Sequence, residues 1–98
     1  MMRCGRLAPL AVLALWPAIA YAQGPDNVLV VINDASPASV QIGEAYAKRR
    51  SIAQDHIVRI KTVTTETIER RAFTASIESP IGNWLFRNNL NDRVLYIV

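Results

Sequence analysis

A continuous run of five apolar residues, VLVVI at positions 28–32, constrains the fold of this chain more than any other feature. All of them except Leu29 are β-branched, and no polar residue alternates with them. Such a run is typical of a strand that is covered on both faces, as in a parallel sheet with helices on each side. We therefore predict a buried strand over residues 27–33.

The segment that follows has the start and the periodicity of a helix. Ser36 is a favoured N-cap and Pro37 a favoured first helical residue, so residues 36–50 are predicted to be helical. At 100° per residue, an apolar arc forms on one side of this helix. That arc consists of Val40, Ile42, Gly43, Tyr46 and Ala47.

The rest of the chain repeats the alternation of strand and helix. A second strand is predicted over residues 56–62, where Arg59 and Lys61 alternate with apolar residues as on an edge strand. Residues 64–89 are predicted to be mostly helical. Thr64 or Thr65 is expected to cap the start.

Pro80 interrupts the register of that helical segment. We expect either a kink or two helices that share a face, with Ser79 capping the second. A turn over residues 88–92 then leads to a third apolar strand over residues 93–98.

This order predicts an α/β fold with a three-stranded parallel sheet (β-α-β-α-β), Rossmann-like and joined by right-handed crossovers. A sheet of three strands is thin, and the third strand runs to Val98 without a turn or a polar tail. Residues 23–98 are thus expected to be the N-terminal part of a larger, here incomplete, α/β domain. The alternative is a complete small protein that ends on a strand.

Residues 1–22 have the features of a signal peptide. Arg3 and Arg6 precede an uncharged apolar run, and Ala20 and Ala22 then flank Tyr21, as at a signal peptidase site. We predict cleavage between Ala22 and Gln23 by signal peptidase, and export to the periplasm or beyond the cell. The apolar run, residues 7–20, is shorter than the ~20 residues of a stable membrane span, although an uncleaved anchor is the alternative.

Charge and cysteine content exclude several classes of function. Without Arg3 and Arg6, the count of Lys and Arg falls from 11 to 9 against 8 acids, so the processed chain carries only +1. The sequence contains no basic patch that would indicate binding to nucleic acid. Cys4, the only cysteine, lies ahead of the apolar run, so the processed chain can form no internal disulfide and no thiolate zinc site.

The candidate ligand-binding residues lie directly after the first strand. In open parallel sheets, ligands bind beyond the carboxyl ends of the strands, where Asn33, Asp34 and Ser36 are expected. Asp34 suits a hydroxyl group, an ammonium group or a metal ion better than an anion. The alternative interpretation is structural, because Asn and Asp stabilise turns and Ser36 caps the helix.

Other catalytic and cofactor signatures are missing from the sequence. His56, the single histidine, is predicted at the start of its strand, which is the wrong end for a site in this fold. A triad of Ser36, His56 and Asp34 would therefore need residues from opposite ends of the sheet. No glycine-rich dinucleotide fingerprint, Walker lysine motif or G-x-S-x-G occurs, so no cofactor and no metal is predicted.

The stretches DNVLVVINDASPASVQIGEAYAKRR, IVRI, SPIGNWL and DRVLYIV resemble the N-terminal part of a family of uncharacterised exported bacterial proteins. The resemblance covers residues 26–98 and implies a longer chain, with no activity to carry over. The sheet is similar, more weakly, to those of caspase- and gingipain-type peptidases, whose catalytic motifs find no match here. A second weak similarity is to the first lobe of periplasmic sugar-binding proteins.

These observations predict an exported α/β protein of unknown biochemical function. Three more specific hypotheses remain open. One is the N-terminal half of a hydrolase or peptidase-like domain with its catalytic residues beyond Val98. Another is a periplasmic lobe that binds a small molecule through Asn33, Asp34 and Ser36. The third is a structural or surface protein in which these residues only shape a turn.

Overall fold

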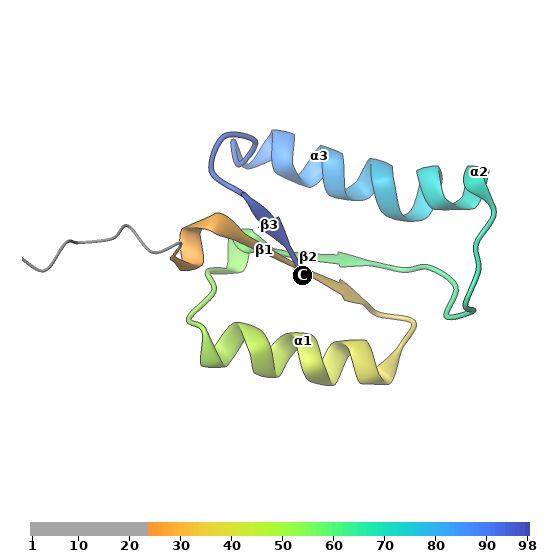
Figure 1. Ribbon diagram of the computed structural model, residues 1–98, viewed down its shortest axis with the longest axis horizontal. Helices are drawn as coiled ribbons and strands as arrows, with labels where there is room; N and C mark the ends of the chain where they lie inside the picture. The colour runs from red at the N-terminus through yellow and green to blue at the C-terminus, as the bar shows by residue number, and fades with distance from the viewer. Residues whose placement is uncertain (1–23) are drawn as a thin grey trace, which may run out of the picture.

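The computed structural model describes residues 24–98, which form a parallel sheet between two layers of helix (Figure 1). The strands are β1 (Val28–Asn33), β2 (Ile57–Ile60) and β3 (Tyr96–Ile97), and β1 is central in the order β2-β1-β3. Both neighbours pair with β1 in parallel. The predicted α/β class with a three-stranded parallel sheet is confirmed. The predicted signal peptide and the cleavage site at Ala22 and Gln23 lie outside the described residues.

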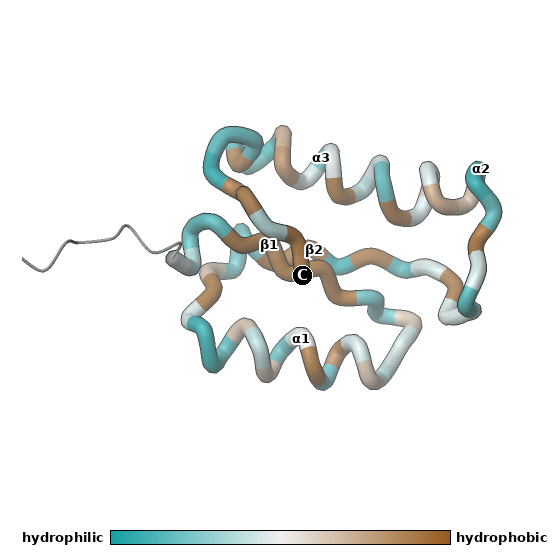
Figure 2. Tube along the Cα trace, viewed as in Figure 1, coloured by the Kyte–Doolittle hydropathy of each residue, from teal (hydrophilic) through white to brown (hydrophobic). Residues whose placement is uncertain are grey.

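The central strand β1 is buried on both faces, as its apolar run predicts. Its side chains alternate between two clusters, and Figure 2 shows the hydrophobic strands enclosed between the helices. On one face Leu29 packs with buried Val58, Ile60 and Leu90 beneath the second helical layer. On the other face Val30 and Ile32 pack with buried Ala47 and Ile52 beneath α1 (Pro37–Arg49).

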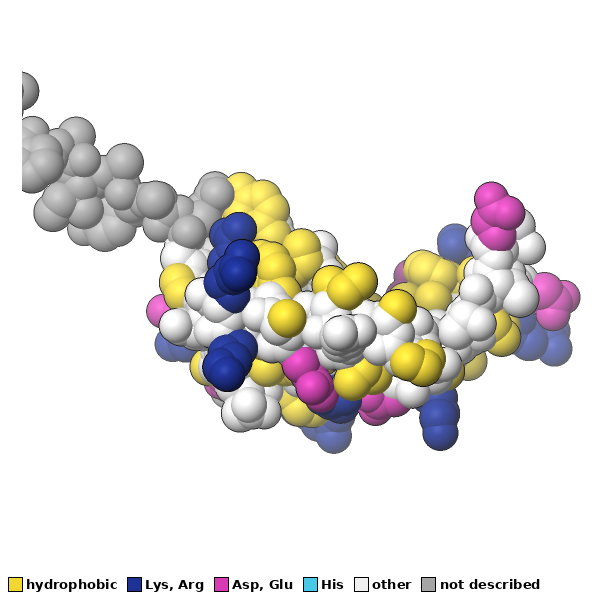
Figure 3. Space-filling view, turned by 90° about the horizontal axis from the view of Figure 1, so that it is seen from below, with side chains coloured by type: hydrophobic (Ala, Val, Ile, Leu, Met, Phe, Trp, Pro, Cys, Tyr) yellow, Lys and Arg dark blue, Asp and Glu magenta, His cyan; other side chains and the backbone are white. Residues whose placement is uncertain are grey.

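Helix α1 begins as the sequence predicts. The Ser36 hydroxyl accepts the Ser39 backbone N–H at 3.2 Å, and Pro37 is the first helical residue. Figure 3 views the molecule from the α1 side, with Lys and Arg side chains gathered where the helix ends. The predicted apolar arc is wrong at Ile42, which is 69% exposed, because α1 lies over β1 and nothing described covers its flank toward β3.

Gly43 allows α1 to lie directly on β1. A Cβ atom at this position would lie 2.5 Å from Ile32 Cγ1 and 2.8 Å from Ile32 Cδ1, closer than real atoms approach. Glycine is therefore required by packing, although it has a lower helix propensity than alanine. Because α1 is centred on β1, the outer strands β2 and β3 are left partly uncovered on this face.

The connection between β2 and β3 becomes helical later in the chain than predicted. Residues 61–69 are not helical, and helix begins only at α2 (Arg70–Phe73). The predicted cap at Thr64 or Thr65 is wrong, because the Thr65 hydroxyl instead donates to the carbonyl oxygen of Thr67 at 2.8 Å. The local hydrogen bonds of threonine favour a turn here over a helix start.

A π-helical segment, Thr74–Glu78, joins α2 to α3 (Ser79–Arg87) without a break. Ser79 has helical backbone angles and does not cap α3, so that prediction is also wrong. The wider π turn accommodates Pro80, whose ring and missing N–H are incompatible with a regular helical turn. The second helical layer is thus one continuous element.

Helices α1 and α3 end in the same way. Ser51 and Asn89 have left-handed backbone angles, with φ of 55° and 56°, directly after the last turn of each helix. The next residues, Ile52 and Leu90, return a backbone N–H to the carbonyls of Ala47 and Leu85, both at 2.9 Å. This is the Schellman arrangement, and it inserts buried Ile52 and Leu90 into the two clusters.

The outer strands are shorter than predicted. His56 belongs to a 3-10 turn, Gln54–His56, rather than to β2. β3 pairs with β1 over few residues, although the Val98 N–H also donates to the Leu29 carbonyl at 3.0 Å. Side chains of residues 95–98 are 45–61% exposed, so the apolar third strand is not covered by the described residues. Within residues 24–98, no helix is both long enough and apolar enough to cross a membrane.

We predict that Gly43→Ala lowers the free energy of unfolding by about 1–3 kcal/mol, because the added methyl group overlaps Ile32. Gly82→Ala is the matched control, since a Cβ at Gly82 in α3 meets no atom within 4 Å. That control is expected to raise stability by about 0.5–1 kcal/mol. Chemical denaturation measures both variants. A Gly43→Ala variant as stable as the wild type contradicts the packing described.

Candidate functional site

Asn33 fastens β1 to β2 at the carboxyl edge of the sheet. Its Oδ1 accepts the backbone N–H groups of Thr62 and Ala35, both at 3.1 Å. Its Nδ2 donates to the Thr62 carbonyl at 3.1 Å. The side-chain amide thus takes the place of a backbone pair where the two strands separate. All three contacts are to the chain itself, so Asn33 has a structural task.

A chain of hydrogen bonds extends from Asn33 to α1 on one side and to the π-helical segment on the other. The Ser39 hydroxyl on α1 accepts the Asn33 N–H at 2.9 Å. On the other side, the hydroxyls of Thr62 and Ser76 lie 2.8 Å apart, and Ser76 donates to the Ala72 carbonyl at 2.6 Å. This network connects α1, β1, the segment that follows β2 and the π-helical segment. Ser39 and Ser76 were not predicted as members of the site, because no sequence motif surrounds them.

Asp34 is the exposed member of the predicted site. Its Oδ1 accepts a hydrogen bond from Arg59 Nη1 at 2.6 Å, and Arg59 Nη2 donates to Glu44 Oε2 at 2.6 Å. These bonds, first that to Glu44 and then that to Asp34, raise the pKa of Arg59 above its ordinary value. We call these three residues the Asp34–Arg59–Glu44 cluster. It links the β1–α1 loop, β2 and α1, and it carries one net negative charge.

The three predicted ligand-binding residues therefore lie together, but they differ in whether a side-chain polar atom is free to contact a ligand. Asn33 bonds to neighbouring backbone groups and Ser36 caps α1. Only Asp34, 39% exposed at its side chain, has an oxygen (Oδ2) without a hydrogen bond to another described residue. The structural interpretation accounts for Asn33 and Ser36, and Asp34 retains a group that could contact a ligand.

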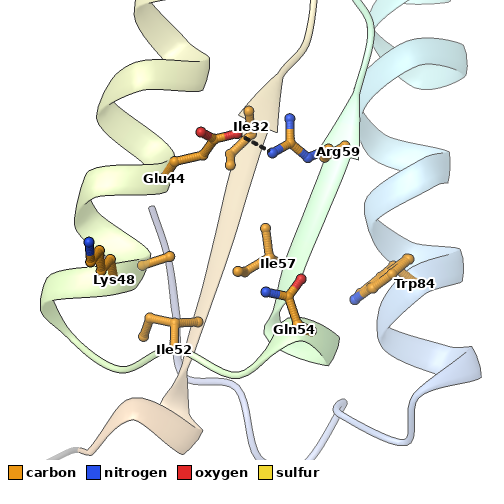
Figure 4. Close-up of a pocket in the computed structure, with 9 residues that line it drawn as sticks. Ile32, Glu44, Lys48, Ile52, Gln54, Ile57, Arg59 and Trp84 are labelled. Carbon is orange, nitrogen blue, oxygen red and sulfur yellow. Dashed lines mark hydrogen bonds and ion pairs between the residues drawn. The ribbon is translucent and has the colours of Figure 1, made fainter.

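A concave region lies in the space between α1 and β2 (Figure 4). We call it the β2-side groove, and it has a volume of about 810 Å³. Its apolar residues are Ile32, Ala47, Ile52 and Ile57, and its polar residues are Glu44, Lys48, Gln54 and Arg59. Trp84 of α3 reaches it from the other face, with its indole N–H donating to the Asp55 carbonyl at 2.8 Å. This groove was not predicted from the sequence.

His56 lies at the opposite end of the sheet from the predicted site. It is buried, and its Nδ1–H donates to the carbonyl of Val28 at the start of β1, at 3.1 Å. The prediction that His56 lies at the amino ends of the strands is confirmed. A triad with Ser36 and Asp34 is therefore ruled out by position. No cluster of three or more potential metal ligands occurs among residues 24–98.

We predict that Asn33→Ala lowers the free energy of unfolding by about 1–3 kcal/mol, because the paired backbone groups of Thr62 and Ala35 lose their partner. Asn83→Ala, at an exposed position of α3, is the matched control and should stay within about 0.5 kcal/mol of the wild type. Chemical denaturation again compares the variants. Equal stability of Asn33→Ala and Asn83→Ala would contradict the structural role proposed for Asn33.

Comparison of the chain with models of protein families, with curated proteins and with solved structures found no match. The resemblance to a family of exported bacterial proteins consequently stays a prediction from the sequence, and any functional assignment has to come from the site itself.

Proposed function

We propose that this protein is exported and that its α/β domain binds a small hydroxylated molecule at the carboxyl edge of the sheet. The observation that carries the binding proposal is the strand order β2-β1-β3. The chain runs from the central strand β1 to β2 on one side of it and then to β3 on the other side. Its direction across the sheet therefore reverses, and the reversal lies between β1 and β3. In doubly wound sheets of this order, ligands bind at that reversal, outside the carboxyl ends of the strands.

The β1–α1 loop supplies the polar groups at this position. Asp34 offers Oδ2, a hydrogen-bond acceptor, and the loop beside it is exposed at Ala35. Asn33 and Ser36 position the loop through their bonds to Thr62 and Ser39. A carboxylate repels phosphate and accepts hydrogen bonds from hydroxyl groups, which favours a neutral polyol or sugar.

The export proposal depends on residues 1–22, with their two arginines, the apolar run over residues 7–20 and the small residues Ala20 and Ala22. Expression of the full chain in a bacterial host tests it. The exported protein is expected to have the intact mass of a chain that starts at Gln23. Ala22→Leu should block this processing, whereas Ala11→Leu, within the apolar run, should not. A wild-type chain that still begins at Met1 in the membrane fraction contradicts the proposal.

The binding proposal is tested by titrating the purified, isotopically labelled protein with a panel of monosaccharides and following the backbone amide resonances. Saturable shifts are expected at residues 33–39 for at least one sugar. Asp34→Asn should abolish them, because Oδ2 is replaced or neutralised, whereas Asp92→Asn in an exposed turn should leave them unchanged. The proposal is wrong if no sugar shifts these residues, or if Asp34→Asn binds as the wild type does.

A further inference from the structure

We propose that two copies of this chain associate through the open edge of β3, so that their sheets join across a two-fold axis. One side of β3 pairs with β1, and no described strand pairs with the other side. The inference goes beyond the proposed sugar binding and does not depend on it, because Asn33, Asp34 and Ser36 lie outside this edge.

Exposed apolar side chains are concentrated around this edge. Among residues 24–98, seven large apolar side chains are 45–75% exposed, and six of them lie on β3, directly beside it in the chain, or on the neighbouring helices. These six are Ile42, Phe86, Leu95, Tyr96, Ile97 and Val98. Half-exposed side chains of this size leave about 500 Å² of apolar surface open on each copy. Two copies would bury about 1,000 Å² of such surface, close to what a specific interface requires.

Ile42 and Phe86 extend the apolar surface from β3 onto both helical layers. A hollow of about 400 Å³ lies between α1 and β3, and both Ile42 and Val98 line it. On the other face of the sheet, the Trp84 indole N–H of α3 donates to the Asp55 carbonyl just before β2. Phe86 follows Trp84 by two residues, a rotation of about 200°, so it lies on the flank of α3 toward β3.

The backbone of β3 has hydrogen-bonding groups directed at the open edge. The Val98 N–H donates to the Leu29 carbonyl at 3.0 Å, and the Val98 carbonyl accepts the Val31 N–H at 2.7 Å. Val98 therefore faces β1. Because successive residues of a strand direct these groups to opposite sides, the N–H and carbonyl of Ile97 face away from β1. With a two-fold axis beside Ile97, this residue exchanges two hydrogen bonds with Ile97 of the second copy.

The lack of charge at this edge favours a second copy as the partner. A two-fold axis brings each residue near it opposite its own copy, so a charged side chain there would meet the same charge. Residues 94–98 have no charged side chain, and none lines the hollow beside β3. The other edge of the sheet carries Arg59 on β2 and Lys61 directly after it, which protect an edge against pairing. Of the two edges, β3 is therefore the one suited to pair with itself.

The dimensions of the joined sheet are consistent with contact between the helices. The order β2-β1-β3 would continue into β3, β1 and β2 of the second copy, which places the two β1 strands about 14 Å apart. A two-fold axis normal to the sheet puts both α1 helices, each over its own β1, on the same face. Helices ~10–12 Å in diameter leave only a narrow space at that separation. Ile42 of each copy fills this space, above Tyr96 and Val98.

Sedimentation velocity of the purified protein, from about 10 μM to about 1 mM, tests the proposal. A reversible monomer–dimer equilibrium is expected for an interface of this area. Ile97→Lys should raise the Kd of the dimer about tenfold or more, because two ammonium groups meet at the axis, and Ile42→Lys should do so from the helix side.

Val63→Lys is the matched control for these variants. Val63 is 54% exposed and Ile97 is 55% exposed, but Val63 follows β2 at the other edge of the sheet. Val63→Lys should therefore dimerise as the wild type does. Chemical denaturation confirms that each variant is folded.

Ile97→Cys, in a Cys4→Ser background that leaves no other cysteine, locates the axis. Opposed residues of a hydrogen-bonded antiparallel pair have Cα atoms about 5.5 Å apart, which is within the ~4.4–6.8 Å range of disulfides. Mild oxidation should give a covalent dimer of Ile97→Cys, whereas Val63→Cys in the same background should stay monomeric.

Three results overturn the proposal. They are a monomer at every concentration, equal dimer affinity of Ile97→Lys and Val63→Lys, and equal crosslinking of Ile97→Cys and Val63→Cys. A monomer would assign the β3 edge to another occupant, such as a further strand of the sheet or a different protein. Assembly beyond a dimer would indicate that β3 pairs with a different edge, which also contradicts a two-fold axis at Ile97.

Discussion

The contact between Gly43 and Ile32 determines how this molecule is layered. It places α1 directly on the central strand, so that the buried apolar run of β1 is covered on that face by a single helix. The other face of β1 is covered by the second helical layer through Leu29 and Leu90. One helix cannot cover three strands, so the surface of the molecule is hollowed on both sides of α1. The residues of the neighbouring outer strand then determine how polar each hollow is.

The carboxyl edge is held by polar groups rather than by apolar packing. Beyond Ile60 the backbone of β2 leaves the sheet, and Asn33 satisfies both backbone groups of Thr62 at that point. The hydroxyls of Thr62 and Ser76 continue the network to the π-helical segment, whose wider turn also accommodates Pro80. Asp34 is thereby presented at the edge of the sheet, where it shares Arg59 with Glu44.

The features that could be predicted from the sequence are those that depend on local chemistry. The β-branched run predicted a strand covered on both faces, and the Ser36–Pro37 pair predicted the start of α1. The edge position of β2 followed from the alternation of Arg59 with apolar neighbours. Each of these patterns involves residues close together in the chain, where propensity and periodicity act.

The features that could not be predicted depend on contacts between distant residues. Ile42 has helical periodicity like its neighbours, yet it is exposed because of where α1 sits on the sheet. The π-helical segment accommodates Pro80 and brings Ser76 within hydrogen-bond distance of Thr62, which a single-residue rule for Ser79 does not capture. Arg59 of β2 pairs with Asp34 and also with Glu44 of α1, and these two residues lie 25 and 10 residues from Asp34 in the sequence, so only the fold brings the three together.

The position of α1 over β1 is the central claim, since the β2-side groove and the exposure of the outer strands follow from it. Nuclear Overhauser effects from the Gly43 Hα protons measure that position directly. Strong effects to the Ile32 side-chain protons, with none to Ile57, are the result that the account predicts. Strong effects from Gly43 to Ile57 would place α1 over β2, fill the groove between them and contradict the account.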